Sequence, residues 1–132
     1  MPETQTARQE IAPLLRLWND TLLTEDAHKV AALYAKDATL LPTLSKEICQ
    51  SPEAIAEYFR VFLSFRPKAT ILHENIRLHG PIGINSGIYS FEVQMEGGVH
   101  HLIGRFTFVY RKDADGWKIL AHHSSLMPEH EG

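Results

Sequence analysis

The chain has 132 residues, of which 44% are hydrophobic and 22% are charged, and its formal net charge at pH 7 is −3. This length corresponds to one domain, residues 1–132, and the composition is that of a globular protein rather than a disordered or fibrous one. Because 16 acidic residues outnumber 13 basic ones and no run of positive charge occurs, the sequence argues against nucleic-acid binding.

The sequence carries no pattern for export or membrane insertion. The first residues are polar, and no stretch approaches the roughly 18 apolar residues of a membrane span. Cys49 is the only cysteine, so the chain can form no internal disulfide. We therefore expect a cytoplasmic protein that binds no membrane.

The first half of the chain has helical patterns. Apolar residues at helical spacing are Ile11, Leu14, Leu15, Trp18 and Leu22. Pro13 fits this helix if the helix starts near Ala12, and otherwise it kinks the first turn. Asp26 is a cap for a short second helix, and Ser51-Pro52-Glu53 marks the start of a third, which Pro67 ends.

The rest of the chain reads as strands. Residues 37–43 predict a short edge strand, because Pro42 cannot donate to a β-ladder. Apolar residues then alternate with polar ones over residues 72–78, 89–95, 106–110 and 117–121. Helices followed by a meander of strands predict an α+β fold, with the helices packed on one face of an antiparallel sheet.

Two turns set the expected register of this sheet. With Gly97-Gly98 at the tip of the first hairpin, Phe91 pairs with Gly104 and Tyr89 pairs with Phe106. This register places the large apolar residues of both strands on one face, which should receive the helices.

The second hairpin spans residues 112–117. With Lys112 opposite Trp117, Phe108 pairs with Ala121, and His123 points toward the helices. A shift by one residue would instead bring polar side chains beside the phenylalanines, so burial favours this register.

The inner face of the sheet and the helices should enclose a tapering cavity. Its predicted lining is Trp18, Tyr34, Tyr58, Phe59, Tyr89, Phe91, Phe108, His123 and Ser125. An inward histidine in an apolar setting can act as a base or a hydrogen-bond donor, and His123 with Tyr89 is the candidate catalytic pair. The alternative is a structural His123, bonded to a tyrosine hydroxyl or a backbone carbonyl.

The outer face mixes polar and apolar side chains, which is typical of a subunit interface, although a solvated face is the simpler alternative. The predicted interface residues are Ser90, Glu92, Arg105, Leu120, His122 and Ser124. The pairs His100-His101 and His122-His123 are adjacent on strands, so their rings point to opposite faces. We therefore expect no metal site, and nothing in the sequence indicates a cofactor.

Several stretches, taken in order, resemble one family. They are residues 26–38, 40–43, 55–59, 76–80, 86–91, 105–110 and 116–125, the last reading Gly-Trp-Lys-Ile-Leu-Ala-His-His-Ser-Ser. They cover nearly the whole chain and resemble the nuclear transport factor 2-like superfamily, in particular bacterial relatives of the calcium/calmodulin-dependent protein kinase II association (hub) domain. The resemblance implies a cone-shaped, cystatin-like α+β fold.

The resemblance also implies a function. Hub domains pair into dimers, and in the kinase those dimers stack into rings. This chain has no kinase domain, so the expected function is a stand-alone homo-oligomerising domain whose partner is a second copy of itself. Positions that hold pocket arginines in the kinase hub correspond to Tyr89, Phe108 and Ser124 here, so the expected ligand is small and mostly apolar.

Two alternatives stay open. The same superfamily includes SnoaL-like cyclases and ketosteroid isomerase-like enzymes, which use carboxylates in the cone. The chain resembles them in fold but has no inward Asp on the matching strands, so an isomerase, cyclase or hydratase would have to use His123 and a tyrosine as acid–base groups. The other alternative is a scaffold that binds a different protein.

Overall fold

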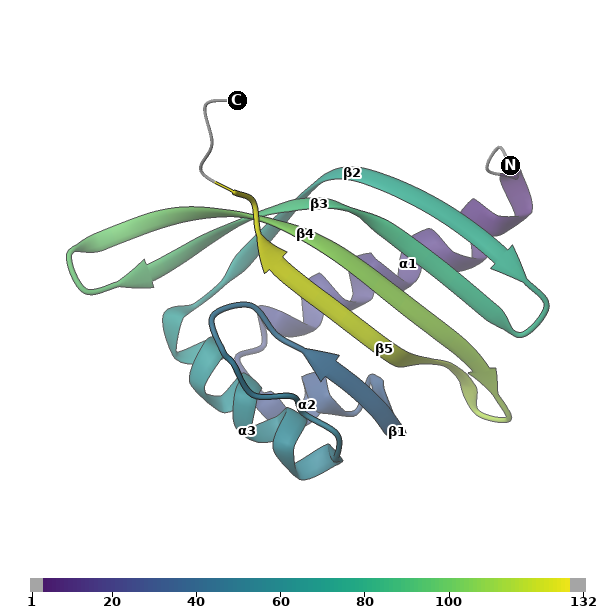
Figure 1. The fold of residues 1–132 in the computed structure, drawn as a ribbon, viewed down its shortest axis with the longest axis horizontal. Helices are drawn as coiled ribbons and strands as arrows, with labels where there is room; N and C mark the ends of the chain where they lie inside the picture. Colours follow the sequence, from purple (N-terminus) through teal and green to yellow (C-terminus); the bar gives the residue numbers. More distant parts are fainter. Residues whose placement is uncertain (1–3, 129–132) are drawn as a thin grey trace.

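Figure 1 shows the computed structural model of the protein, which describes residues 4–128. The elements are, in chain order, α1 (Gln5–Leu22), α2 (Ala27–Ala31), β1 (Tyr34–Leu41), α3 (Pro52–Phe62), a 3-10 turn (Leu63–Phe65), β2 (Lys68–His79), β3 (Ile82–Met95), β4 (Gly98–Asp113) and β5 (Gly116–Leu126). The helices mostly precede the long strands, and the predicted α+β fold class is confirmed.

Each α-helix begins at a residue whose side chain caps its first turn. Thr4, Asp26 and Ser51 each accept a hydrogen bond from a backbone N–H at the start of the helix that follows. The starts predicted at Asp26 and Ser51 are therefore confirmed. α1 begins well before Ala12, so Pro13 lies inside it. Within the described residues, no helix is both long and apolar enough to cross a lipid bilayer.

The strands form one sheet in the order β1-β5-β4-β3-β2. Strands β2 to β5 pair antiparallel, whereas β1 runs parallel to β5 and forms an edge of the sheet, as Pro42 predicted. α1 lies along one face of the sheet, and α3 lies beside β1 (Figure 1). We call the face that α1 covers the inner face and the opposite one the outer face.

The β3–β4 hairpin turns one residue earlier than predicted. Its two corner residues are Glu96 and Gly97. Of these two, only Gly97 has a left-handed backbone (φ +91°), so the corner requires one glycine. The pairing shifts by two residues, and Tyr89 rather than Phe91 lies opposite Gly104. Because side chains alternate with a period of two, this shift leaves the predicted faces of β3 and β4 unchanged.

A β-bulge at Leu120 changes the second half of β5. Tyr110 pairs with Ile119, whereas the next residue back on β4, Val109, pairs with Ala121. Leu120 therefore has no partner on β4, and every residue after it lies on the opposite face from the one a regular ladder would give.

The predicted orientation of four residues is wrong for this reason. His122 and Ser124 are buried on the inner face, at 3% and 7% exposure. His123 is exposed and Ser125 is half-buried, and both lie on the outer face.

The core lies between the inner face and the helices, with Trp18 of α1 at its centre. The Trp18 ring stacks on Tyr89, with centroids 6.0 Å apart, and meets Phe59, Phe91 and Phe108 edge-on. Such offset and T-shaped pairs add to the hydrophobic contribution of the buried area. The aromatic core thus fixes how α1 and α3 sit on the sheet.

A buried carboxylate ties α1 to the inner face near its β2 edge. Glu74, whose side chain is 7% exposed, accepts hydrogen bonds from both Nη atoms of Arg16 (2.8 and 2.9 Å) and from Asn85 Nδ2 (3.0 Å). Burial alone would raise the pKa of Glu74, but the bonds from Arg16 and Asn85 outweigh it and hold the pKa below its ordinary value.

Candidate functional site

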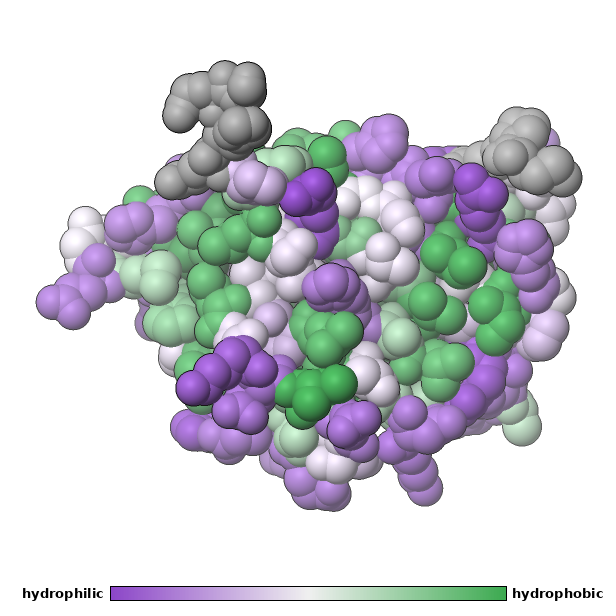
Figure 2. Space-filling view, in the orientation of Figure 1, coloured by the Kyte–Doolittle hydropathy of each residue, from purple (hydrophilic) through white to green (hydrophobic). Residues whose placement is uncertain are grey.

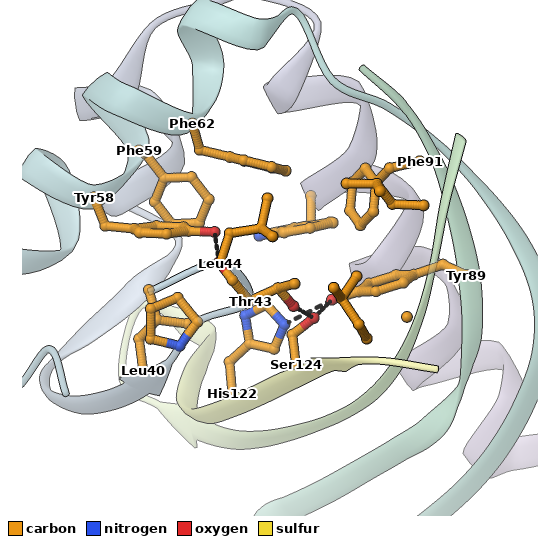
Figure 3. A pocket seen from close by; sticks show the side chains of 15 residues that line it. Leu40, Thr43, Leu44, Tyr58, Phe59, Phe62, Tyr89, Phe91, His122 and Ser124 are labelled. Carbon is orange, nitrogen blue, oxygen red and sulfur yellow. Dashed lines mark hydrogen bonds between the residues drawn. The ribbon is translucent and has the colours of Figure 1, made fainter. Parts of the chain in front are cut away.

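A small cavity opens between α3 and the inner face of the sheet (Figure 3). Rings from α3 form one side of it, and Tyr89 and Phe91 of β3 form another, while His122 and Ser124 of β5 supply its polar part. The complete lining is Trp18, Leu40, Pro42, Thr43, Leu44, Tyr58, Phe59, Phe62, Tyr89, Phe91, Leu102, Gly104, His122, Ser124 and Leu126. None of these described residues is an Asp, Glu, Lys or Arg, so the wall is apolar with a few uncharged polar groups.

The surrounding side chains almost fill the cavity. The space in which a water-sized sphere can be centred is about 20 Å³, which is enough for about one water molecule. Leu44 and Leu126 stand at its mouth and are 52% and 43% exposed. A larger ligand can therefore enter only if side chains at the mouth move.

His122 is held on every side. Its ring stacks on Phe108, with centroids 3.8 Å apart, and meets the Trp18 ring edge-on. The hydroxyl of Tyr34 lies 2.8 Å from Nδ1, and the hydroxyl of Tyr89 lies 3.3 Å from Nε2. Trp18 Nε1–H in turn donates to the Tyr34 hydroxyl (3.2 Å). Both ring nitrogens therefore have a partner, which a buried imidazole requires.

The hydrogen bonds continue from His122 to the mouth of the cavity. The hydroxyl of Tyr89 donates to Ser124 Oγ (2.6 Å), and Thr43 Oγ1 donates to the same atom (2.5 Å). The hydroxyl of Tyr58 donates to the backbone carbonyl of Thr43 (2.9 Å), which holds the loop after β1 against α3. Figure 3 shows the contacts around Ser124 and the Tyr58 bond.

The buried groups of this network are uncharged at neutral pH. Burial, together with a smaller charge repulsion from the neighbouring His123, lowers the pKa of His122 to about 3. Burial also raises the pKa values of the Tyr34 and Tyr89 hydroxyls, so both stay protonated. The cavity wall therefore offers hydrogen bonds but no ionic contact.

Five of the residues predicted to line the cavity do so. They are Trp18, Tyr58, Phe59, Tyr89 and Phe91. Their faces follow from helical spacing and from strand alternation, and neither depends on the register of β5.

Four predicted lining residues lie elsewhere. Tyr34 and Phe108 are behind the wall, where they contact His122. His123 and Ser125 lie on the outer face because of the bulge, so His123 is not placed to form a catalytic pair with Tyr89 inside the cone.

The predicted interface residues divide in the same way. Ser90, Glu92 and Arg105 lie on the outer face as predicted, and Leu120 is the half-buried bulge residue. His122 and Ser124 are buried on the inner face and cannot contact a partner through the outer one.

Sequence reasoning missed the loop that follows β1. Thr43 and Leu44 reach the cavity from this loop, and Leu126 reaches it from the end of β5. No periodicity marks loop residues, so their approach to the cavity could be found only from the folded chain. His122 and Ser124 were predicted to lie on the outer face as interface residues, because no local pattern in the sequence indicates the bulge at Leu120.

The described residues offer no metal site and no activated thiol. Within residues 4–128, no three His, Cys, Asp or Glu side chains are grouped closely enough to hold a metal ion. Cys49 is buried, and burial raises the pKa of its thiol.

Comparison with known proteins gives a family match and similar solved structures. The family model of the calcium/calmodulin-dependent protein kinase II association domain matches residues 7–128. No curated protein matches the sequence significantly. Among solved structures, a proposed association domain of this kind from Xanthomonas campestris is 42% identical, covers 92% of this chain and 89% of its own, and superposes with a TM-score of 0.89.

More distant structures share the fold. A proposed dehydratase of the nuclear transport factor 2-like family from Streptomyces avermitilis is 10% identical, with coverage of 95% of this chain and 99% of its own and a TM-score of 0.83. A ketosteroid isomerase-like protein from Erwinia carotovora atroseptica is 14% identical, with coverage of 95% and 99% and a TM-score of 0.76. With a nuclear transport factor 2-like fold and a family match over residues 7–128, the chain belongs to the calcium/calmodulin-dependent protein kinase II association domain family.

Proposed function

We propose that the protein is a self-associating domain, in which two copies pair through their outer sheet faces and each cone binds a small, mostly apolar ligand. Membership of an association domain family supports the self-association. The neutral, aromatic lining of the cavity supports a ligand of low polarity.

The observation that carries the proposal is the apolar content of the outer face. Ile103 is 45% exposed at the middle of β4, and Ile84, Ile88 and Val109 on the same face are half-buried. Figure 2 shows green apolar patches, with pale and purple polar side chains between them, on the side of the molecule that faces the viewer in Figure 1. A broad sheet surface of this composition is typical of a subunit interface.

A catalytic function has less support. A general acid or base works best when its pKa lies near the working pH, and the pKa of His122 is lowered to about 3. The carboxylates on which the isomerases and cyclases rely are lacking among the described lining residues. The isomerase, cyclase or hydratase alternative would therefore need a different acid–base pair.

Sedimentation of an interface variant tests the proposal. Ile103→Glu brings an unpaired charge into the proposed interface, where its desolvation should weaken dimerisation by a few kcal/mol, or about a hundredfold in Kd. Val61→Glu is the matched control, because Val61 is 47% exposed on α3, away from the outer face.

We expect wild type and Val61→Glu to sediment as dimers or larger assemblies at about 10 μM, and Ile103→Glu to sediment as a folded monomer. A monomeric wild-type protein would contradict self-association. If Ile103→Glu stays dimeric, the copies pair through another surface.

A further inference from the structure

The hydrogen bonds beneath the cavity leave one hydrogen without an acceptor. Five contacts join six side chains in one row, in the order Trp18, Tyr34, His122, Tyr89, Ser124 and Thr43. Each side chain brings one polar hydrogen to the row, provided that the imidazole is neutral, and each contact uses one hydrogen. One hydrogen therefore remains.

The directions of the two hydrogen bonds to Ser124 place the remaining hydrogen on its own hydroxyl. Tyr89 and Thr43 both donate to Ser124 Oγ, so the two lone pairs of this oxygen are occupied. Because the Tyr89 hydroxyl donates its hydrogen to Ser124, its oxygen must accept a hydrogen bond from the Nε2–H of His122. Nδ1 then accepts from Tyr34, whose own oxygen accepts from Trp18. No acceptor among the described residues remains for the Ser124 hydroxyl hydrogen.

The Ser124 hydroxyl is placed to use this hydrogen on a ligand. Ser124 lines the cavity, and its side chain is nearly buried there among apolar groups. A hydroxyl that accepts two hydrogen bonds is polarised by them and becomes a better donor. The lining holds no charged residue, so an anion would not be compensated there.

We propose that Ser124 is the recognition residue of the cavity, and that its free hydroxyl hydrogen selects a neutral ligand with a hydrogen-bond acceptor, such as a carbonyl oxygen, on an otherwise apolar body. This inference rests on the ligand-binding part of the proposed function. It adds the chemical class of the ligand and the hydroxyl group that would bind it.

Entry to this site runs past Leu44. Leu44 lines the cavity from the loop after β1, is about half exposed, and has a left-handed backbone (φ +68°), which is strained for a residue with a side chain. Leu44→Ala removes apolar atoms from the mouth and changes none of the six polar side chains. It therefore provides a wider cavity in which small probes can be compared.

Binding of two probes of similar shape tests the proposal. Acetophenone carries a carbonyl oxygen and ethylbenzene does not, and their Kd values can be measured by NMR titration of Leu44→Ala. Adding Ser124→Ala should reduce the preference for acetophenone over ethylbenzene by about tenfold, the effect of one buried hydrogen bond. Adding Ser125→Ala, which changes the neighbour on the outer face, should leave the preference unchanged.

The outcomes separate this inference from the proposed function. If both probes bind and Ser124→Ala leaves the ratio of their Kd values unchanged, Ser124 does not recognise the carbonyl oxygen, although the cavity still binds a ligand. If neither probe binds, both the inference and the ligand-binding part of the proposed function are wrong, whereas self-association through the outer face is unaffected.

The direction of the hydrogen bonds can be tested without any variant. Nitrogen-15 NMR of the His122 ring should show a protonated Nε2 and an unprotonated Nδ1 in the wild-type protein. A protonated Nδ1 would reverse the row, leave the free hydrogen at Tyr34 behind the cavity wall, and overturn the proposal.

Discussion

Acid should destabilise this protein through His122. The ordinary pKa of a histidine is 6.5, and the pKa of His122 in the folded chain is lowered to about 3, chiefly by burial. Below pH 6.5 the His122 ring binds a proton in the unfolded chain but stays neutral in the folded chain. The contribution of His122 to stability is therefore fully present above pH 6.5 and is lost as the pH falls from there toward 3.

The magnitude follows from the two pKa values. At about pH 5, nearly all of the unfolded chains carry the proton on this ring and almost none of the folded ones do, which lowers the free energy of unfolding by about 2 kcal/mol relative to about pH 7.5. Urea unfolding at both pH values, followed by tryptophan fluorescence at fixed protein concentration, measures this difference.

Two variants separate His122 from its neighbours. His122→Gln removes the titrating ring, so between the two pH values this variant should lose about 2 kcal/mol less stability than wild type does. His123→Gln removes the exposed neighbour and should retain nearly the whole dependence. An equal pH dependence of stability in wild type and His122→Gln would refute the reasoning. So would an NMR titration in which the His122 ring of the wild-type protein titrates near 6.5. The NMR measurement remains possible if the variant does not fold.

Two further predictions concern packing and charge. Gly104→Val should destabilise the fold by about 1–3 kcal/mol, because a Cβ at Gly104 would lie 3.0 Å from the Tyr89 ring; an unchanged melting temperature would contradict the close approach of this ring to the strand. Glu74→Gln should cost about 1–2 kcal/mol near neutral pH, a value at the low end because Arg16 is largely exposed. A carboxyl group whose pKa is lowered in the folded chain stabilises the fold above its unfolded-state pKa and loses that contribution as the pH falls. The variant should therefore lose less stability than wild type below about pH 4.5. Urea unfolding as a function of pH checks this, and a variant with the wild-type acid dependence would show that Glu74 is not its source.

Local signals predicted the helices whose ends they mark. Asp26 and Ser51 cap α2 and α3 because a short polar side chain can satisfy the free N–H groups of the first turn. The start of α1 was harder to predict, because most of its first residues are polar, and Pro13 is itself a typical residue of a first helical turn.

Alternation predicted the faces of β3 and β4 but not their pairing. The inner set, which includes Tyr89, Phe91 and Phe106, stays inward for any shift of the hairpin by two residues. Only the conformation of the corner distinguishes such shifts, and two neighbouring glycines leave that corner open to more than one placement.

The cavity residues of β5 could not be predicted from the local pattern. A regular strand buries His123 and Ser125, and a bulge at Leu120 buries His122 and Ser124, so both arrangements bury one histidine and one serine. Burial alone therefore does not choose between them. The choice depends on partners that lie far away in the sequence.

The hydroxyls of Tyr34 and Tyr89 are those partners, and removing them tests this explanation of the bulge. Tyr34→Phe leaves both His122 Nδ1 and Trp18 Nε1 without a partner in the core and should cost about 2 kcal/mol or more. Tyr89→Phe leaves Nε2 unpaired and should cost about 1–3 kcal/mol. Tyr58→Phe is the control, because its hydroxyl reaches only a backbone carbonyl in a half-buried position, and it should cost about 1 kcal/mol or less. If the first two variants unfold within about 0.5 kcal/mol of wild type, these hydrogen bonds do not select the bulged register, and packing of the His122 ring against Phe108 must do so instead.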